Sequence, residues 1–213
     1  MRLTAIEGLE NVPRAGPVLV VSRHFHHLYD GVVYLAILRR QVHILVALDW
    51  VSSPRLRWLM EPACSVAELP VVLRRERLRR ARGSGYAGPK SAYRATEAGK
   101  YLRRGLRFSV SLLRRGRLLV IFPEAYPNVD PIETPKTDAA DFLPFRRGFV
   151  TLIQMAQRDG QTRVAVVPAG LRYRDAGSWH IGVRFAAPLY LESGDDPAAF
   201  TDRVEREVKA LSV

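Results

Sequence analysis

Short apolar segments rich in β-branched residues alternate along this chain with segments of helical periodicity. The apolar segments are bounded by proline, glycine or charged residues and predict buried strands. They cover Pro17–Ser22, Val42–Leu48, Leu118–Phe122, Arg163–Leu171 and Ile181–Ala186. Helical patterns occupy Tyr34–Arg40, Leu102–Leu113, Gly148–Arg158 and Pro197–Leu211. This alternation predicts a single α/β domain with a largely parallel, mixed central sheet flanked by helices.

Length and composition indicate one globular domain over residues 1–213. With 47% hydrophobic and 25% charged residues, the chain is neither disordered nor an array of membrane spans. No apolar run approaches the roughly 20 residues that cross a bilayer, and Met1–Glu7 lacks the apolar stretch of a signal peptide. The single cysteine, Cys64, excludes a disulfide framework and a CxxC metal site. We therefore expect a cytoplasmic protein without a transmembrane helix or a metal.

Positive charge predominates, because 33 lysines and arginines against 21 aspartates and glutamates give a net charge of +12. Such a surface attracts nucleic acid, anionic lipid headgroups or phosphorylated substrates. Arginines concentrate at Arg74–Arg82, and the earlier segment Trp50–Met60 interleaves aromatic, aliphatic and arginine residues, a composition suited to the membrane interface. An ordinary core helix with an arginine face is the alternative interpretation of Trp50–Met60. We predict a basic, membrane-facing segment at about residues 50–90 that holds the protein peripherally on the inner face of the membrane.

Three histidines and an aspartate follow the first predicted strand, at a strand end where open α/β sheets bind ligands. They are His24, His26, His27 and Asp30. A histidine held by a carboxylate is a general base, because the carboxylate fixes the tautomer and stabilises the imidazolium. His26 is the alternative base, since it stands four positions before Asp30 and would share its face on a continuous helix. A metal cluster and a plain polar loop are the other interpretations.

A carboxylate also follows the predicted strand Leu118–Phe122, because proline ends that strand in the sequence Phe122-Pro123-Glu124. Glu124 at this sheet edge could accept a hydrogen bond from a substrate hydroxyl or hold a basic side chain. An exposed glutamate in a turn is the alternative interpretation.

Together these segments resemble the glycerolphosphate and lysophosphatidic acid acyltransferase family over nearly the whole chain. His24 with Asp30 resembles the His–Asp motif of that family, and Glu7–Ser22 resembles the lead-in to it. The later blocks of the family are matched by Pro70–Arg74, Phe122–Ala125, Phe145–Gly148 and Val166–Ala169. Several blocks in the same order are far more specific than any single block.

The resemblance implies a glycerolphosphate acyltransferase-like fold and a direct acyl transfer without a cofactor. His24, oriented by Asp30, would take the proton of an acceptor hydroxyl, which then attacks the thioester of acyl-CoA or acyl-carrier protein. The implied substrate-binding residues are Arg74, Phe122, Pro123, Glu124, Arg146 and Arg147. The implied partners are this thioester donor, a lipid or glycerolipid acceptor such as a lysophosphatidic acid or a related alcohol, and an anionic membrane surface.

The sequence departs from the family pattern at three places. Five residues separate His24 from Asp30 instead of the commoner four. Arg23 replaces the usual asparagine, and Ala125-Tyr126-Pro127 replaces a Gly-x-Arg segment whose arginine clamps a phosphate. The three arginines among the implied binding residues could bind an acceptor phosphate bidentately. An uncharged alcohol, such as a sugar on a lipid, is the alternative acceptor.

Two non-enzymatic classes compete with the acyltransferase. A catalytically degenerate family member would bind lipid without turnover, as the altered third block suggests. A basic nucleic-acid-binding protein would account for the charge, but the chain has no RNA-recognition signature, zinc finger or helix-turn-helix pattern. We therefore expect no nucleic-acid partner.

Overall fold

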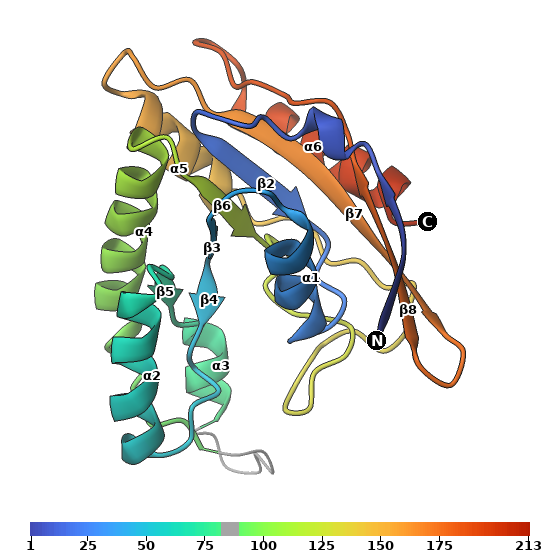
Figure 1. Cartoon of the computed structure of the whole chain (residues 1–213). Helices are drawn as coiled ribbons and strands as arrows, with labels where there is room; N and C mark the ends of the chain where they lie inside the picture. Colours follow the sequence, from blue (N-terminus) through green and yellow to red (C-terminus); the bar gives the residue numbers. More distant parts are fainter. Residues whose placement is uncertain (82–89) are drawn as a thin grey trace. The chain divides into compact units, whose positions relative to one another are not determined.

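The structure, a computed structural model, describes residues 1–81 and 90–213 (Figure 1). The chain divides into two compact units. The first consists of Met1–Val42, Val110–Asp130 and Thr134–Val213, and the second of His43–Ser109 and Pro131–Glu133. The part of the predicted basic segment at residues 82–89 lies outside the described residues.

A mixed sheet forms the core of the first unit. Its central strand β2 (Val18–Ser22) pairs in parallel with β6 (Leu118–Ile121) and with β7 (Ala165–Asp175). Beyond β7, β8 (Trp179–Phe185) is antiparallel, and β1 (Arg2–Glu7) is parallel to β8. Every residue of β2 and β6 is buried, which is why these strands are continuous apolar runs rather than alternating patterns. The predicted α/β class with a mostly parallel, mixed sheet is confirmed.

Three α-helices and one short 3-10 helix flank this sheet. They are η1 (Leu9–Asn11), α1 (Tyr29–Ile37), α5 (Gly148–Gln157) and α6 (Pro197–Leu211). Helix α6 begins where the Asp196 side chain accepts hydrogen bonds from the backbone N–H groups of Ala198 and Ala199. It lies along β7 (Figure 1), where a Cβ on Gly170 would come within 2.4 Å of the Leu211 carbonyl carbon. The close approach of helix and strand therefore requires glycine.

The second unit is built around helices and a small parallel sheet. Strand β3 (Val42–Ile44) leads the chain into it, and β4 (Val46–Ala47) pairs in parallel with β5 (Val71–Val72). Its described residues form the helices α2 (Pro54–Val66), α3 (Arg75–Arg80) and α4 (Ala98–Arg114). Helix α4 belongs to this unit only as far as Ser109. The buried core includes Cys64, as expected for a small apolar residue. No helix of the described residues is long and apolar enough to span a bilayer.

Two arginines of the predicted basic segment face inward. Arg74 and Arg77 both contact the fully buried carboxylate of Asp49, at 2.9 Å each, and Arg77 is itself buried. Arg80 forms an ion pair with Glu133 at 2.9 Å. Arg74 and Arg77 therefore neutralise an internal carboxylate, whereas Arg75, Arg79 and Arg80 are exposed at the surface of this unit.

The structure corrects two element boundaries. Helix α1 begins at Tyr29, five residues before the predicted start, because His26 and the preceding loop satisfy its first N–H groups. The predicted strand Val42–Leu48 is two short strands, the second of which pairs with β5 in a separate sheet. Strands β1 and β5 were not predicted.

Candidate active site

The sheet brings His24 and Asp30 together. His24 follows the end of β2, and Asp30 lies in the first turn of α1. The Nδ1 atom of His24 lies 2.8 Å from Oδ2 of Asp30, whose side chain is fully buried. When Nδ1 carries the proton of this hydrogen bond, the neutral ring presents Nε2 as its acceptor. The ring also stacks on Phe122, with 4.5 Å between ring centroids, so contacts on two sides fix its orientation.

Asp30 accepts hydrogen bonds from three further groups. The backbone N–H groups of Phe25 and His26 donate to its carboxylate at 2.7 and 3.1 Å. The hydroxyl of Tyr173, on β7, donates to Oδ1 at 2.6 Å. Burial, together with the negative charge of Asp30, raises the pKa of Tyr173, so this hydroxyl keeps its proton and remains a donor. These donors stabilise the ionised carboxylate inside the protein.

His26 has a structural role. Its ring is buried, and Nδ1 accepts hydrogen bonds from the backbone N–H groups of Leu28 and Tyr29 at 3.2 and 3.3 Å. Burial, followed by the neighbouring His27, lowers the pKa of His26. His27 is exposed, and its Nδ1 contacts the carbonyl of Val129. The described residues contain no group of three metal-ligating side chains that could hold an ion.

Protonation of His26 should therefore weaken the fold. The folded-state pKa is below the unfolded value of about 6.5, so the unfolded chain binds the proton first and stability falls as the pH drops below about 6.5. We expect urea midpoints measured at pH 7 and pH 5 to show a smaller decrease for His26→Asn, because the amide oxygen still accepts the two N–H groups and does not titrate. Equal decreases in both proteins would contradict this role.

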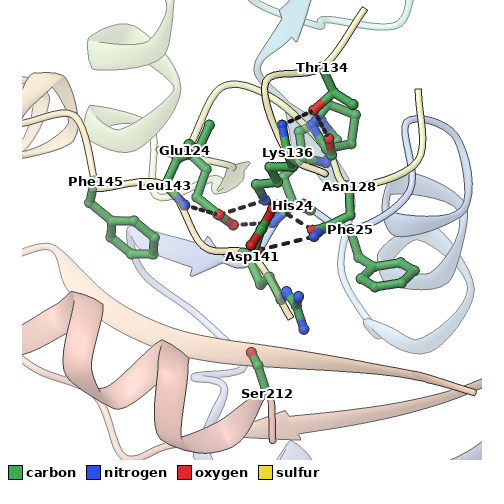
Figure 2. A network of polar contacts seen from close by, with 12 residues as sticks. His24, Phe25, Glu124, Asn128, Thr134, Lys136, Asp141, Leu143, Phe145 and Ser212 are labelled. Carbon is green, nitrogen blue, oxygen red and sulfur yellow. Dashed lines mark hydrogen bonds and ion pairs between the residues drawn. The ribbon is translucent and has the colours of Figure 1, made fainter. Parts of the chain in front are cut away.

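Glu124 is buried and bound on both oxygens. Its Oε1 accepts the backbone N–H of His24 at 2.8 Å, and its Oε2 accepts the backbone N–H of Leu143 at 2.9 Å. Lys136 lies 2.6 Å from the same Oε2 (Figure 2). Ala125, the next residue, has a left-handed backbone with φ of 66°. This conformation explains why a glycine suits the position after such a glutamate.

Lys136 completes the cage around His24, and sequence reasoning missed it. Its Nζ donates to the carbonyl oxygen of His24 at 2.9 Å and to Oδ1 of Asn128 at 3.0 Å (Figure 2). Its side chain is fully buried, and burial lowers its pKa despite the pairing with Glu124. Glu124 thus holds the N–H of His24 while Lys136 holds its C=O.

Arg23 packs beside this network, at the position where the family pattern has asparagine. Its guanidinium lies 5.0 Å from the ring centroid of Phe25 and 4.5 Å from that of Phe142. It also donates to the carbonyl of Ala139. Burial lowers the pKa of Arg23, and the charge of Glu124 opposes that shift. Arg23 therefore ties the loop that contains Phe142 and Ala139 to the end of β2.

The remaining predicted binding residues have different surroundings. Pro123 is buried, and its carbonyl accepts the backbone N–H of Arg146 at 3.1 Å. The side chains of Arg146 and Arg147 are exposed at the start of α5. Arg74 belongs to the second unit and is paired with Asp49. The structure therefore brings Asp30, Phe122 and Glu124 into contact with His24, and Arg74 forms its ion pair within the second unit.

The His24–Asp30 pair and the Phe-Pro-Glu turn occur in a chain whose residues 4–172 match the model of the family described as Acyltransferase. The chain belongs to the acyltransferase family. Among solved structures, it is similar to the 1-acyl-sn-glycerophosphate (LPA) acyltransferase PlsC from Thermotoga maritima, with a TM-score of 0.56 and 17% sequence identity. The alignment covers 98% of this chain and 70% of that one, so the two acyltransferase-family chains share a fold. A comparison with curated proteins gave no match.

Proposed function

We propose that this member of the acyltransferase family transfers a fatty acyl group from acyl-CoA or acyl-carrier protein to a hydroxyl of a lipid precursor. The observation that carries the proposal is the 2.8 Å contact between His24 and the fully buried Asp30. A carboxylate held by several donors cannot turn away from the ring, so the histidine stays in the tautomer that a general base requires.

The proposed reaction needs one base and no covalent enzyme intermediate. Nε2 of His24 takes the proton of the acceptor hydroxyl as the oxygen attacks the carbonyl carbon of the thioester. The tetrahedral intermediate collapses, its C–S bond breaks, and the sulfur leaves as a thiol after taking the proton from the imidazolium. Asp30 stabilises the imidazolium electrostatically and stays ionised. The products are an ester and a free thiol.

Glu124 acts in this proposal as a positioning residue. Both of its oxygens are taken up by groups of the protein, among them the N–H of His24 and the ammonium of Lys136. Phe122 supports the ring of His24 by stacking. The exposed arginines at the start of α5 are the proposed contacts for an anionic group of the acceptor, because guanidinium binds phosphate bidentately.

Release of free thiol tests the proposal directly. Purified protein is incubated with acyl-CoA or acyl-carrier protein and with either lysophosphatidic acid or a neutral glycolipid, and thiol is measured with a colorimetric reagent. We expect thiol release that depends on one acceptor class, together with formation of the ester. Binding of lipid without thiol release from any donor and acceptor would support the degenerate lipid-binding alternative instead.

Arg147 should affect the use of a charged acceptor. Replacing it with glutamine removes one guanidinium near the end of the loop held by Glu124, so we expect the KM for a phosphorylated acceptor to rise about tenfold with little change in kcat. The matched control is Arg158→Gln, an exposed arginine at the other end of α5. Equal KM values for Arg147→Gln and Arg158→Gln would show that Arg147 does not contact the acceptor.

A further inference from the structure

Helices α2 and α4 are connected in the second unit by the hydrogen bond from Tyr101 to Glu61, and both line a groove of about 840 Å³. All of its lining residues belong to that unit, whereas His24 and Asp30 belong to the first. Residues of both helices line it together with Leu69, which follows α2, and the apolar lining includes Trp58 on α2 and Phe108 on α4. The groove is therefore a candidate binding surface in its own right.

The groove has an excess of positive charge. Arg57 within it is neutralised by Glu61 and Glu97, each at 2.9 Å, and the Tyr101 hydroxyl also donates to Glu61. Arg104 and Arg107 also line the groove, but they are exposed and have no hydrogen-bonding or ionic partner in the described part of the chain. Their two guanidinium groups are therefore available to an anionic ligand.

Large apolar side chains on the same helices are exposed to solvent. Trp58 is 79% exposed and Val66 is 87% exposed on α2, and Leu102 is 56% exposed on α4. Exposed apolar surface next to arginine suits a membrane interface, where the apolar groups leave water and the cations stay at the headgroups. The available arginines of this unit include those on α4, in contrast to the internally paired Arg74 and Arg77.

We propose that the groove between α2 and α4 binds an anionic phospholipid of the bilayer surface. Its acyl chain lies along Trp58, Leu69 and Phe108, and its phosphate pairs with Arg104 and Arg107. The proposal deepens the proposed function and rests on it for its biological purpose, because the lipid surface also contains the acceptor. Binding itself requires no turnover and can be measured without it.

Co-sedimentation of the full chain with vesicles tests the groove. We expect strong partition into phosphatidylglycerol vesicles at low salt and weak partition into phosphatidylcholine vesicles. The double variant Arg104→Gln/Arg107→Gln should reduce partition into phosphatidylglycerol about 30-fold, equivalent to about 2 kcal/mol at about 1 kcal/mol for each arginine. Tryptophan emission should shift to shorter wavelength on binding, and Trp58→Phe should remove most of that shift.

The matched control is Arg172→Gln/Arg174→Gln, which removes the same charge from two exposed arginines of β7 in the first unit. We expect this control to retain most of its partition into phosphatidylglycerol vesicles. An equal loss in both double variants would show that net charge, and not the groove, determines vesicle binding. Unchanged partition of the Arg104→Gln/Arg107→Gln variant would show that the groove does not bind lipid. A loss of binding to acyl-carrier protein in that variant would then identify acyl-carrier protein as the occupant of the groove. His24→Ala should bind vesicles normally, so failure of catalysis and failure of docking are distinguishable.

Discussion

Replacing His24 with alanine should lower acyl transfer by about 10²–10⁴-fold and leave the fold intact. Among the described residues, the substitution removes the only imidazole that is hydrogen-bonded to the buried carboxylate of Asp30. His24 is partly exposed at a strand end, so its loss should change the free energy of unfolding little. Thiol release measures the first expectation, and circular dichroism with urea unfolding measures the second.

The matched control for His24 is His27→Ala, which removes a neighbouring exposed imidazole. We expect His27→Ala to retain activity close to that of the unmodified protein. If His24→Ala remains active and His26→Ala is inactive while still folded, the assignment of the base is wrong. Full activity in His24→Ala, His26→Ala and His27→Ala would exclude imidazole catalysis at this strand end.

Replacing Lys136 with methionine should reduce the free energy of unfolding by about 3–5 kcal/mol. The change leaves Glu124 buried without its cationic partner, which lies 2.6 Å away in the intact protein. It also removes the donor to the carbonyl of His24, so acyl transfer should fall as well. Urea unfolding gives the loss of stability, and thiol release in conditions where the variant is folded gives the loss of activity.

A second substitution separates charge from shape. In the double variant Glu124→Gln/Lys136→Met, a neutral amide replaces the buried carboxylate. We therefore expect this variant to regain part of the stability that Lys136→Met loses. The matched control is Lys209→Met, which breaks a partly exposed pair with Glu205 on one helix and should cost less, about 1 kcal/mol. If Lys136→Met were no more destabilising than Lys209→Met, the buried pair would not stabilise the fold.

The sequence allowed the centre of the fold and the shared sheet edge of His24 and Glu124 to be predicted for the same reason, whereas the choice of His24 over His26 as the base came from the family resemblance. Strands β2 and β6 are buried on both faces, so their residues form uninterrupted apolar runs whose ends are visible in the sequence. His24 and Glu124 come just after those ends, and parallel pairing of the strands brings them to one sheet edge. Their proximity therefore followed from the strand pattern alone.

Lys136 and Tyr173 could not be found in this way. Lys136 lies in a loop without periodicity, and its approach to Glu124 depends on how that loop folds back. Tyr173 lies on β7 beyond the predicted end of that strand, because arginines on either side of it conceal the alternation of the strand. The side chain of Tyr173 is recognisable as a donor to Asp30 only when β7 is placed beside β2.

The arginine-rich segment shows why charge composition alone does not locate a surface. Arg74 and Arg77 converge on Asp49, a carboxylate well removed from them in the sequence. A cluster of cations along a chain can therefore be an internal ion-pair network, and only the fold distinguishes that arrangement from an exposed basic face.

The position of β2 in the sheet affects how the protein is assembled during synthesis. Its two parallel neighbours, β6 and β7, come much later in the chain, and Tyr173 on β7 supplies one of the hydrogen bonds to Asp30. A nascent chain that has not yet emerged as far as residue 175 lacks strand β7 and therefore one of the hydrogen-bond donors to Asp30. Ribosome-bound fragments that end before β7 therefore hold Asp30 with one donor fewer than the folded chain does.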